Sequence, residues 1–381
     1  MKKAGAIVIC IICITALLII NSEHFNRSSF KNISPVSEEE PIITYDNNST
    51  VIINSLLDNT FFKTTVISTS FLDDEGKIIW ERPINTPNPT TSLDGNYLAT
   101  GSELDGDTIN IFNKEGFLFS LVIGNPIVDF SINKSGYVSV ICENQEGYEV
   151  SVYSNEGIEV LKRVIYDEGI YPVTSELADD NEILAISMLN TNFLDLQTNL
   201  VFMKTSKTNE ELSSTGEFAG KDISGQIVAN IKFIDNKLIT FSEEVIAIYK
   251  FENNDFILIN EIIIDNYISE VKIINDKYIA VALGLNRNNI SPYSLGTVII
   301  YDINGEIICE KAGSEQITYM SSTTKGLIIC NNRKVQYMDL YGNIVWEYIN
   351  NRELNGVEYI GNSSLGILIE PSQIVKLRNG F

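Results

Sequence analysis

Two short turn motifs alternate along most of this sequence, and their spacing constrains the fold more than any other feature. The first joins two apolar runs through Asp, Asn or Ser with Gly three residues later, as in Asp73–Gly76 and Asp339–Gly342. The second joins an apolar run to one that often begins with Tyr, as in Asp94–Tyr97 and Asn275–Tyr278. Asp and Asn cap tight turns, and Gly accepts the positive φ that such turns need. Each motif therefore predicts a β-hairpin.

The two hairpins recur with a regular period. The strand after the second motif begins near Tyr97, Tyr137, Ile183, Leu238, Tyr278, Leu327 and Ile367, so it returns every 40 to 55 residues. Two hairpins per period make four strands, which is the size of a β-propeller blade. With one more such strand near 61–66, the sequence predicts eight blades. Seven blades are the alternative if the two chain ends share one sheet.

The two ends of this β domain are predicted to close the ring. Residues 356–378 contain three strands, one fewer than a blade needs, and residues 42–45 can supply the fourth. Closure removes the exposed sheet edges that a domain of so many strands would otherwise have. We therefore predict an all-β fold, a propeller of four-stranded blades over residues 42–381.

The N-terminal end has a different composition. Residues 4–20 are almost entirely apolar and follow Lys2 and Lys3. A helix of this length spans about 25 Å, close to a bilayer core of roughly 30 Å, and the lysines favour a cytoplasmic N-terminus. We expect a single-pass transmembrane signal anchor within residues 1–21, a polar stalk over 22–41, and an extracytoplasmic propeller at the cell membrane. A cleaved signal peptide is the alternative, although no small-residue cleavage site follows the apolar run.

The charge of the chain limits its partners and its chemistry. It has 27 Lys and Arg against 50 Asp and Glu, a net charge of −23, and residues 1–41 carry equal numbers of each sign. The acidic excess therefore belongs to the β domain, which argues against nucleic acid as a partner. The only histidine, His24, precedes that domain. The domain thus lacks the histidine of Ser-His-Asp or Cys-His catalysis and of histidine metal sites.

No residue pattern in the domain points to a metal or a cofactor, and we predict neither. The acidic pairs Asp105 with Asp107 and Asp179 with Asp180 belong to no calcium-loop motif, so we interpret them as solvated turn residues.

The cysteines and tryptophans of the domain are interpreted as core residues. Cys142, Cys309 and Cys330 follow apolar residues in predicted strands and are expected to be small buried side chains, with a disulfide among them left open. Trp80 and Trp346 follow the first hairpin motif, where a packing aromatic is expected rather than one that stacks on a sugar.

The turn at Asp73–Trp80, with the sequence D-D-E-G-K-I-I-W, resembles the repeat of quinoprotein-like propellers, with one residue fewer before the Gly. The whole layout of anchor, stalk and repeats resembles an uncharacterised family of N-terminally membrane-anchored β-propeller proteins of Gram-positive bacteria, within the quinoprotein-like and WD40-like superfamily. The resemblance covers essentially the full chain. Because its motifs are structural turns, it implies the fold and the topology and carries over no functional residue.

The connections between strands differ in length on the two faces of the predicted disc. With the strands of a blade named A to D from the centre outward, the tight A–B and C–D turns share one face, and the B–C and D–A connections share the other. Long connections on the second face are the main pointer to a binding surface. They are predicted at 83–90, 189–199, 206–225 and 284–295. Aromatic and Arg side chains often dominate binding energy, and the candidates on or near this face are Tyr171, Phe193, Arg287 and Tyr293.

These features predict a non-catalytic, membrane-tethered module that binds a protein or a cell-envelope polymer through the face with the longer connections. The alternative is an exported enzyme, either quinoprotein-like or carboxylate-based. The absence of histidine from the domain and of any converging motif favours the binding module.

Overall fold

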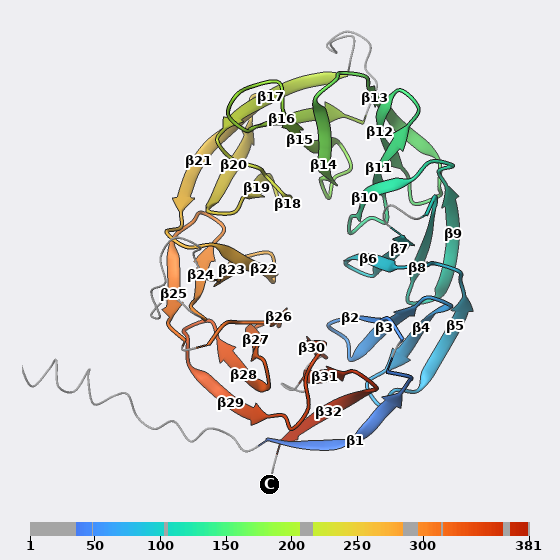
Figure 1. Cartoon of the computed structure of the whole chain (residues 1–381), viewed down its shortest axis with the longest axis vertical. Coiled ribbons are helices and arrows are strands. Elements are labelled where there is room, and N and C mark those ends of the chain that lie inside the picture. The colour runs from blue at the N-terminus through green and yellow to red at the C-terminus, as the bar shows by residue number, and fades with distance from the viewer. Residues whose placement is uncertain are drawn as a thin grey trace, which may run out of the picture.

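The computed structural model describes residues 36–47, 49–102, 106–205, 216–284, 296–313, 315–360 and 366–379. Within these residues, thirty-two strands form eight antiparallel sheets of four strands each. The sheets are arranged as blades around a central channel (Figure 1). The prediction of an all-β propeller with eight four-stranded blades is confirmed.

The first four blades follow the chain order A to D. Blade 1 consists of β2 (Val51–Ser55), β3 (Thr60–Thr65), β4 (Ser68–Asp73) and β5 (Ile78–Pro83). Blade 2 consists of β6 (Pro89–Asp94), β7 (Tyr97–Ser102), β8 (Thr108–Asn113) and β9 (Gly116–Val122). Blade 3 consists of β10 (Ile127–Ile132), β11 (Val138–Asn144), β12 (Gly147–Tyr153) and β13 (Glu159–Ile165). Blade 4 consists of β14 (Ile170–Leu177), β15 (Ile183–Asn190), β16 (Gln197–Lys204) and β17 (Glu217–Ser224).

The second half repeats this plan until the closing blade. Blade 5 consists of β18 (Asn230–Ile234), β19 (Lys237–Phe241), β20 (Val245–Glu252) and β21 (Asp255–Ile263). Blade 6 consists of β22 (Ile268–Ile274), β23 (Tyr278–Leu283), β24 (Val298–Asp302) and β25 (Ile307–Lys311). Blade 7 consists of β26 (Tyr319–Ser322), β27 (Gly326–Asn331), β28 (Lys334–Asp339) and β29 (Ile344–Ile349). Blade 8 consists of β30 (Gly356–Tyr359), β31 (Gly366–Glu370), β32 (Gln373–Asn379) and the N-terminal strand β1 (Val36–Thr44).

The two chain ends close the ring within blade 8, as predicted. Strand β1 pairs antiparallel with β32, with Val36 opposite Asn379 and Thr44 opposite Gln373. The strand begins at Val36 rather than at residue 42, so residues 36–41, which were assigned to the polar stalk, are part of the propeller. An outer strand is held by backbone hydrogen bonds to its neighbour and does not require apolar side chains. Because residues 36–41 are mostly polar, composition placed the start of the propeller at residue 42 instead of Val36.

The predicted membrane anchor and the first part of the predicted stalk lie outside the described residues. Those predictions concern residues 1–21 and 22–35. Among the residues that the structure does describe, no helix is long and apolar enough to cross a bilayer.

The hairpin turns have the chemistry that the sequence motifs predicted. The Asp73 carboxylate accepts hydrogen bonds from the backbone N–H groups of Glu75 at 3.1 Å and Lys77 at 2.9 Å. Gly76 has φ of +76°, and a Cβ at this position would lie 2.6 Å from the carbonyl oxygen of Ile42 in β1. Only glycine combines this backbone conformation with so close an approach of the closing strand.

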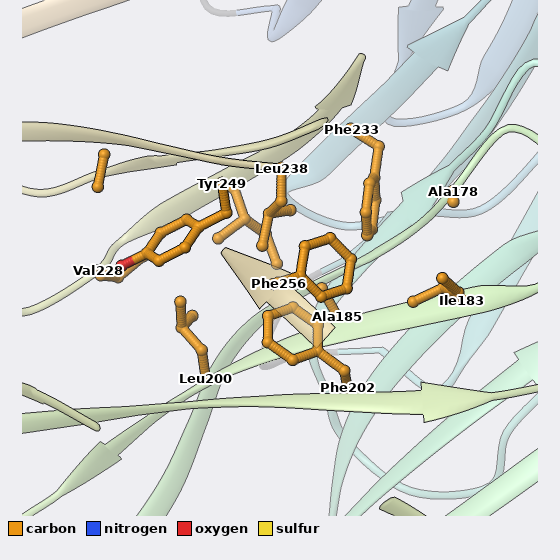
Figure 2. Close-up of a cluster of buried hydrophobic side chains, with 12 residues drawn as sticks. Ala178, Ile183, Ala185, Leu200, Phe202, Val228, Phe233, Leu238, Tyr249 and Phe256 are labelled. Atoms are coloured by element: carbon orange, nitrogen blue, oxygen red, sulfur yellow. The ribbon is translucent and has the colours of Figure 1, made fainter. Parts of the chain in front are cut away.

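The hydrophobic core lies between neighbouring blades. Figure 2 shows the cluster between blades 4 and 5, where the rings of Phe202 and Phe256 stack with their centroids 4.0 Å apart. Trp80 joins blade 1 to blade 2, because its indole N–H donates to the Lys114 carbonyl at 2.9 Å. Trp346 is fully buried between blades 7 and 8. Both are packing aromatics, as predicted: Trp346 lies in the core, and the half-buried Trp80 packs against a core cluster of blades 1 and 2.

The three cysteines of the domain, Cys142, Cys309 and Cys330, are buried and unbridged. Burial raises the pKa of Cys142 and of Cys330 to about 11. These thiols behave as the small apolar side chains that the sequence predicted.

Candidate functional site

The order of strands fixes which connections share a face. The A–B and C–D turns lie on one face, which we call the tight-turn face, and the B–C and D–A connections lie on the other, which we call the loop face. The connections predicted at 83–90 and 189–199 belong to the loop face, and residues 285–295 of the connection predicted at 284–295 lie outside the described residues. The connection at 189–199 is shorter than predicted, because β15 extends to Asn190 and β16 begins at Gln197.

The prediction of one long loop-face connection at 206–225 is wrong, because most of its second half forms a strand. Residues Glu217–Ser224 form β17, the outer strand of blade 4, and residues 206–215 lie outside the described residues. Strand β17 has no apolar run, and its backbone pairs with β16 along its whole length. Local composition therefore could not identify it as a strand.

The structure describes two of the four predicted anchor residues, and both lie on the loop face of blade 4. Tyr171 stands at the start of β14 with 43% of its surface exposed, and its ring packs edge-on against Tyr148 with centroids 5.9 Å apart. Phe193 lies in the connection between β15 and β16 with 59% exposed. Arg287 and Tyr293 fall outside the described residues. Whether these residues bind a partner stays a prediction.

Exposed apolar side chains gather on the loop face of blades 3 to 6. Eight large apolar residues stand there in connections or at strand ends, whereas on the described loop face of the other blades such residues stand singly, as at Ile67, Val122 and Ile349. A surface with several exposed apolar side chains in one region is typical of an interaction site. We call these eight residues the loop patch: Tyr166, Tyr171, Phe193, Leu194, Leu196, Ile227, Ile263 and Tyr267.

The same region is acidic. Six described segments of this part of the loop face contain no Lys or Arg: 143–147, 166–169, 191–196, 225–229, 242–244 and 264–267. They carry eight exposed carboxyl side chains, which we call the acidic rim: Glu143, Glu146, Asp167, Glu168, Asp195, Glu243, Glu244 and Asp265. The tight-turn face differs, since its turns include Lys77, Lys114, Lys134, Lys277 and Lys325.

A pocket of about 580 Å³ opens between the inner strands of blades 5 and 6. Two members of the loop patch, Ile227 and Tyr267, stand on its wall beside Glu243 of the acidic rim. Its other side chains come mostly from β18 and β22 and include Ile268, Val271, Ile273 and, toward the channel, Lys232 and Glu270. A mainly apolar wall with a few convergent polar groups is the usual composition of a ligand pocket.

Lys232 belongs to a cluster of charges that crosses the channel. Its ammonium lies 2.7 Å from the Asp94 carboxylate of blade 2 and 2.5 Å from the Glu176 carboxylate of blade 4. A second lysine, Lys134 of blade 3, binds Asp179 of blade 4 at 2.8 Å and Asp276 of blade 6 at 2.9 Å. Because Asp94 ends an A strand and the Lys134 cluster lies in A–B turns, both clusters bridge the channel toward its tight-turn end.

A third polar group joins the blades at the ring closure. One carboxylate oxygen of Glu358, in β30, accepts hydrogen bonds from the hydroxyls of Ser55 in blade 1 and Ser321 in blade 7, both at 2.9 Å. Burial raises the pKa of Glu358, and Lys272 and the two hydroxyls offset this only in part. Burial likewise raises the pKa of Glu270, which lies 3.3 Å from Lys272. The partners of Glu358 and Glu270 therefore lie in three blades: Ser55 in blade 1, Lys272 in blade 6 and Ser321 in blade 7.

Several residues of this site were not predicted from the sequence. Tyr267 and the pair Glu243-Glu244 lie in short connections, and only the ring places them beside the pocket. Lys232 could have been predicted from the sequence. A single lysine between Ile231 and Phe233 in an inner strand indicates a partly buried charge, which needs a partner of opposite charge.

Comparison with known proteins places the chain in a family. Residues 31–378 match the model of a family of unknown function, DUF5711. The chain belongs to the DUF5711 family. No curated protein matches the sequence.

Solved structures share the fold of this DUF5711 protein. BamB from Moraxella catarrhalis is similar with a TM-score of 0.54 and 13% identity, over 90% of this chain and 97% of that one. Kluyveromyces lactis Hsv2 aligns with a TM-score of 0.48 and 13% identity, over 80% of this chain and 98% of that one. Kuenenia stuttgartiensis hydrazine synthase aligns with a TM-score of 0.47 and 12% identity, over 89% and 97%. At such identities the likeness to BamB concerns the fold alone.

Proposed function

We propose that this DUF5711 protein is a non-catalytic binding module, tethered to the outer side of the cell membrane by residues 4–20, that holds a partner on the loop face of blades 3 to 6. The observation that carries the proposal is the loop patch on the loop face of blades 3 to 6, two of whose members, Ile227 and Tyr267, line the pocket between blades 5 and 6. Exposed aromatic and aliphatic side chains beside a preformed pocket are the features from which binding hot spots are built.

The direction of β1 supports this choice of face. Val36 lies beside Asn379, at the end of β32 that reaches the tight-turn face, so the chain enters the propeller on that face. Fifteen residues, 21–35, separate the apolar run from Val36 and reach at most about 50 Å. A membrane anchor at residues 4–20 would therefore hold the tight-turn face nearer the bilayer and leave the loop face accessible to partners.

The charged groups of the channel favour a binding module over an enzyme. Lys232 joins three blades through Asp94 and Glu176, and Glu358 joins blades 1, 7 and 8 through Ser55 and Ser321. These ionisable side chains are engaged in holding the ring together, which leaves them poorly placed for acid–base chemistry on a substrate.

Site-specific photo-crosslinking in intact cells tests the proposed face. The full chain would carry p-benzoylphenylalanine either in place of Phe193 on the loop face or in place of Tyr341 on the tight-turn face, where Tyr341 is 79% exposed. We expect a discrete crosslinked product from position 193 and none from position 341. The same products from both positions, or none from position 193, would contradict the proposal.

Fractionation tests the tether separately. We expect the full chain to stay in the membrane pellet after washing with alkaline carbonate, and a chain that begins at residue 22 to be released. Mature protein that begins after residue 20 and washes off the membrane would contradict an uncleaved anchor.

A further inference from the structure

We infer that the partner presents a cationic polypeptide segment in which Lys or Arg residues stand among apolar ones, with one apolar side chain filling the pocket between blades 5 and 6. This inference rests on the proposed function and specifies the chemistry of its ligand. It follows from three features of the loop face: the sign of its charge, the position of its apolar side chains, and the rigidity with which the two are held together.

The charge of this region selects a cationic partner. The eight carboxylates of the acidic rim are exposed, and the five segments that carry them contain no basic residue. Complementary potentials accelerate association and suppress wrong partners, whereas like charges that face each other weaken binding. An anionic polymer, a nucleic acid or an anionic lipid surface would be repelled here. A segment bearing Lys or Arg would be attracted.

The extent of the region selects a polypeptide rather than a small cation. The loop patch begins with Tyr166 between blades 3 and 4, continues through Phe193 in blade 4, and ends with Tyr267 between blades 5 and 6. A small cation could occupy only one point of a surface that covers the edges of several blades. A segment with alternating apolar and basic side chains would use the patch and the rim together.

The mouth of the pocket holds an acidic and an aromatic side chain next to each other. The N–H of Ile268 donates to the carbonyl of Glu243 at 2.9 Å, which ties the turn of Glu243 to the residue that follows Tyr267. On its other side, the Tyr267 carbonyl accepts a hydrogen bond from Gly284 at 2.8 Å. A Cβ at Gly284 would lie 2.9 Å from the Tyr267 ring, so the ring lies against a position that has no side chain.

The turn that carries Glu243 and Glu244 is itself internally braced. The Ser242 hydroxyl donates to the Val245 carbonyl and accepts from the Val245 N–H, both at 3.1 Å. The Glu244 carbonyl accepts from Ile264 at 2.8 Å. The two carboxylates are therefore presented on fixed backbone, and a bound cation would not have to order a loose loop.

Binding of a pair of designed peptides tests the inference. The probes are two fluorescein-labelled twelve-residue peptides with the same apolar residues, one with Lys and one with Glu at the alternate positions. The full chain would be held in nanodiscs of phosphatidylcholine, with empty nanodiscs as the blank, and binding followed by fluorescence anisotropy at low and high salt. We expect the Lys peptide to bind, more weakly in high salt, and the Glu peptide not to bind.

Matched variants separate the loop face from the general negative charge of the protein. Glu243→Gln with Glu244→Gln removes two carboxylates from the acidic rim, and Glu115→Gln with Glu156→Gln removes two exposed carboxylates from tight turns on the opposite face. We expect the first pair to weaken binding of the Lys peptide by about fivefold or more and the second by less than about twofold. Tyr267→Ala, which keeps the charge, should weaken it by about fivefold or more as well.

Equal weakening by both pairs of variants, or binding of the Glu peptide, would overturn the inference, because binding would then follow net charge or apolar contact alone. Retention of binding by Tyr267→Ala would overturn the role of the pocket. If position 193 still crosslinks a partner in cells while the Lys peptide fails to bind, the proposed function stands and the chemistry inferred here is wrong. If position 193 gives no crosslink, the proposed function itself fails.

Discussion

Lys232 of blade 5 forms an ion pair with Asp94 of blade 2 across the central channel, with 2.7 Å between the ammonium nitrogen and the carboxylate oxygen. The same ammonium binds Glu176 of blade 4. Burial alone would lower the pKa of Lys232, but the two carboxylates outweigh it and raise that pKa. The positive charge of Lys232 does not fully offset the cost of burying two carboxylates. Burial therefore raises the pKa of Glu176 although Lys232 acts to lower it. The ion pairs that join blades 2, 4 and 5 thus share the single positive charge of Lys232.

Replacement of Lys232 by Met should lower the free energy of unfolding at pH 7 by about 3–5 kcal/mol, because two partly buried carboxylates lose their partner. Burial raises the pKa of Glu176 and Lys232 offsets part of that rise, so in the variant the cost of the Glu176 carboxylate is present at neutral pH and is relieved as the pH falls toward the unfolded value near 4. Urea unfolding at pH 7 and pH 4.5 measures both effects. The control is Lys114→Met, which removes an exposed pair with Asp58 and should cost less than about 1 kcal/mol. If Lys232→Met lowered the free energy of unfolding equally at pH 7 and pH 4.5, this explanation of the cost would be wrong.

Replacement of Glu358 by Gln should stabilise the protein at neutral pH. Burial raises the pKa of Glu358 in the folded state, so the folded protein loses stability as the pH rises from the unfolded value near 4.3 through the folded pKa. The Gln carbonyl can accept the hydrogen bonds of Ser55 and Ser321 without that cost. The gain should disappear below about pH 4, where both states of the wild-type carboxyl are protonated. Thermal unfolding of the two proteins across this range tests the expectation, and a variant that is less stable at pH 7 would refute it.

Replacement of Phe256 by Ala should lower the free energy of unfolding by about 3–5 kcal/mol, since the ring is fully buried and stacks on Phe202 between blades 4 and 5. Phe256→Leu keeps most of the volume and should cost distinctly less. Phe193→Ala, on the exposed loop, should change stability by no more than about 0.5 kcal/mol. Chemical denaturation of the three variants measures the order, and equal losses at positions 193 and 256 would show that the core is not where the structure places it.

Removal of the closing strand should open the ring. A chain that begins at residue 46 lacks β1 and the Tyr45 hydroxyl, which donates to the Glu370 carbonyl at 2.5 Å. Its β32 would become an exposed edge, so we expect a lower unfolding midpoint and association between copies. A chain that begins at residue 30 keeps β1 and is the control. A synthetic peptide of residues 36–47 added to the shorter chain should restore the midpoint. An unchanged midpoint and a monomeric state without the peptide would refute closure by β1.

The outer strands show where prediction from the sequence failed. The second strands of blades 2, 4 and 6 are buried on both faces over most of their length, and their predicted starts at Tyr97, Ile183 and Tyr278 coincide with the first residues of β7, β15 and β23. Strand β17 alternates exposed and half-buried residues, and the first part of β1 lies in a Glu-rich segment, so neither stands out from a loop by composition. Their backbone partners, β16 and β32, are what make them strands.

The candidate site was predictable only in its general place. The sequence indicated the loop face and named Tyr171 and Phe193 on it, because strand order alone assigns connections to faces. It did not indicate Tyr267 or Glu243, whose connections are short and become a pocket wall only where blades 5 and 6 meet.

By itself, the sequence determined the hairpins and the four-strand period of the blades, since tight turns and the two-residue period of strands depend on neighbours in the chain. The tertiary structure alone decided that Lys232 meets Asp94 across the channel and that Glu243 and Tyr267 line one pocket between blades 5 and 6. Such contacts join residues far apart in the chain. They depend on how eight blades pack into a closed ring, and no local pattern of side chains contains that geometry.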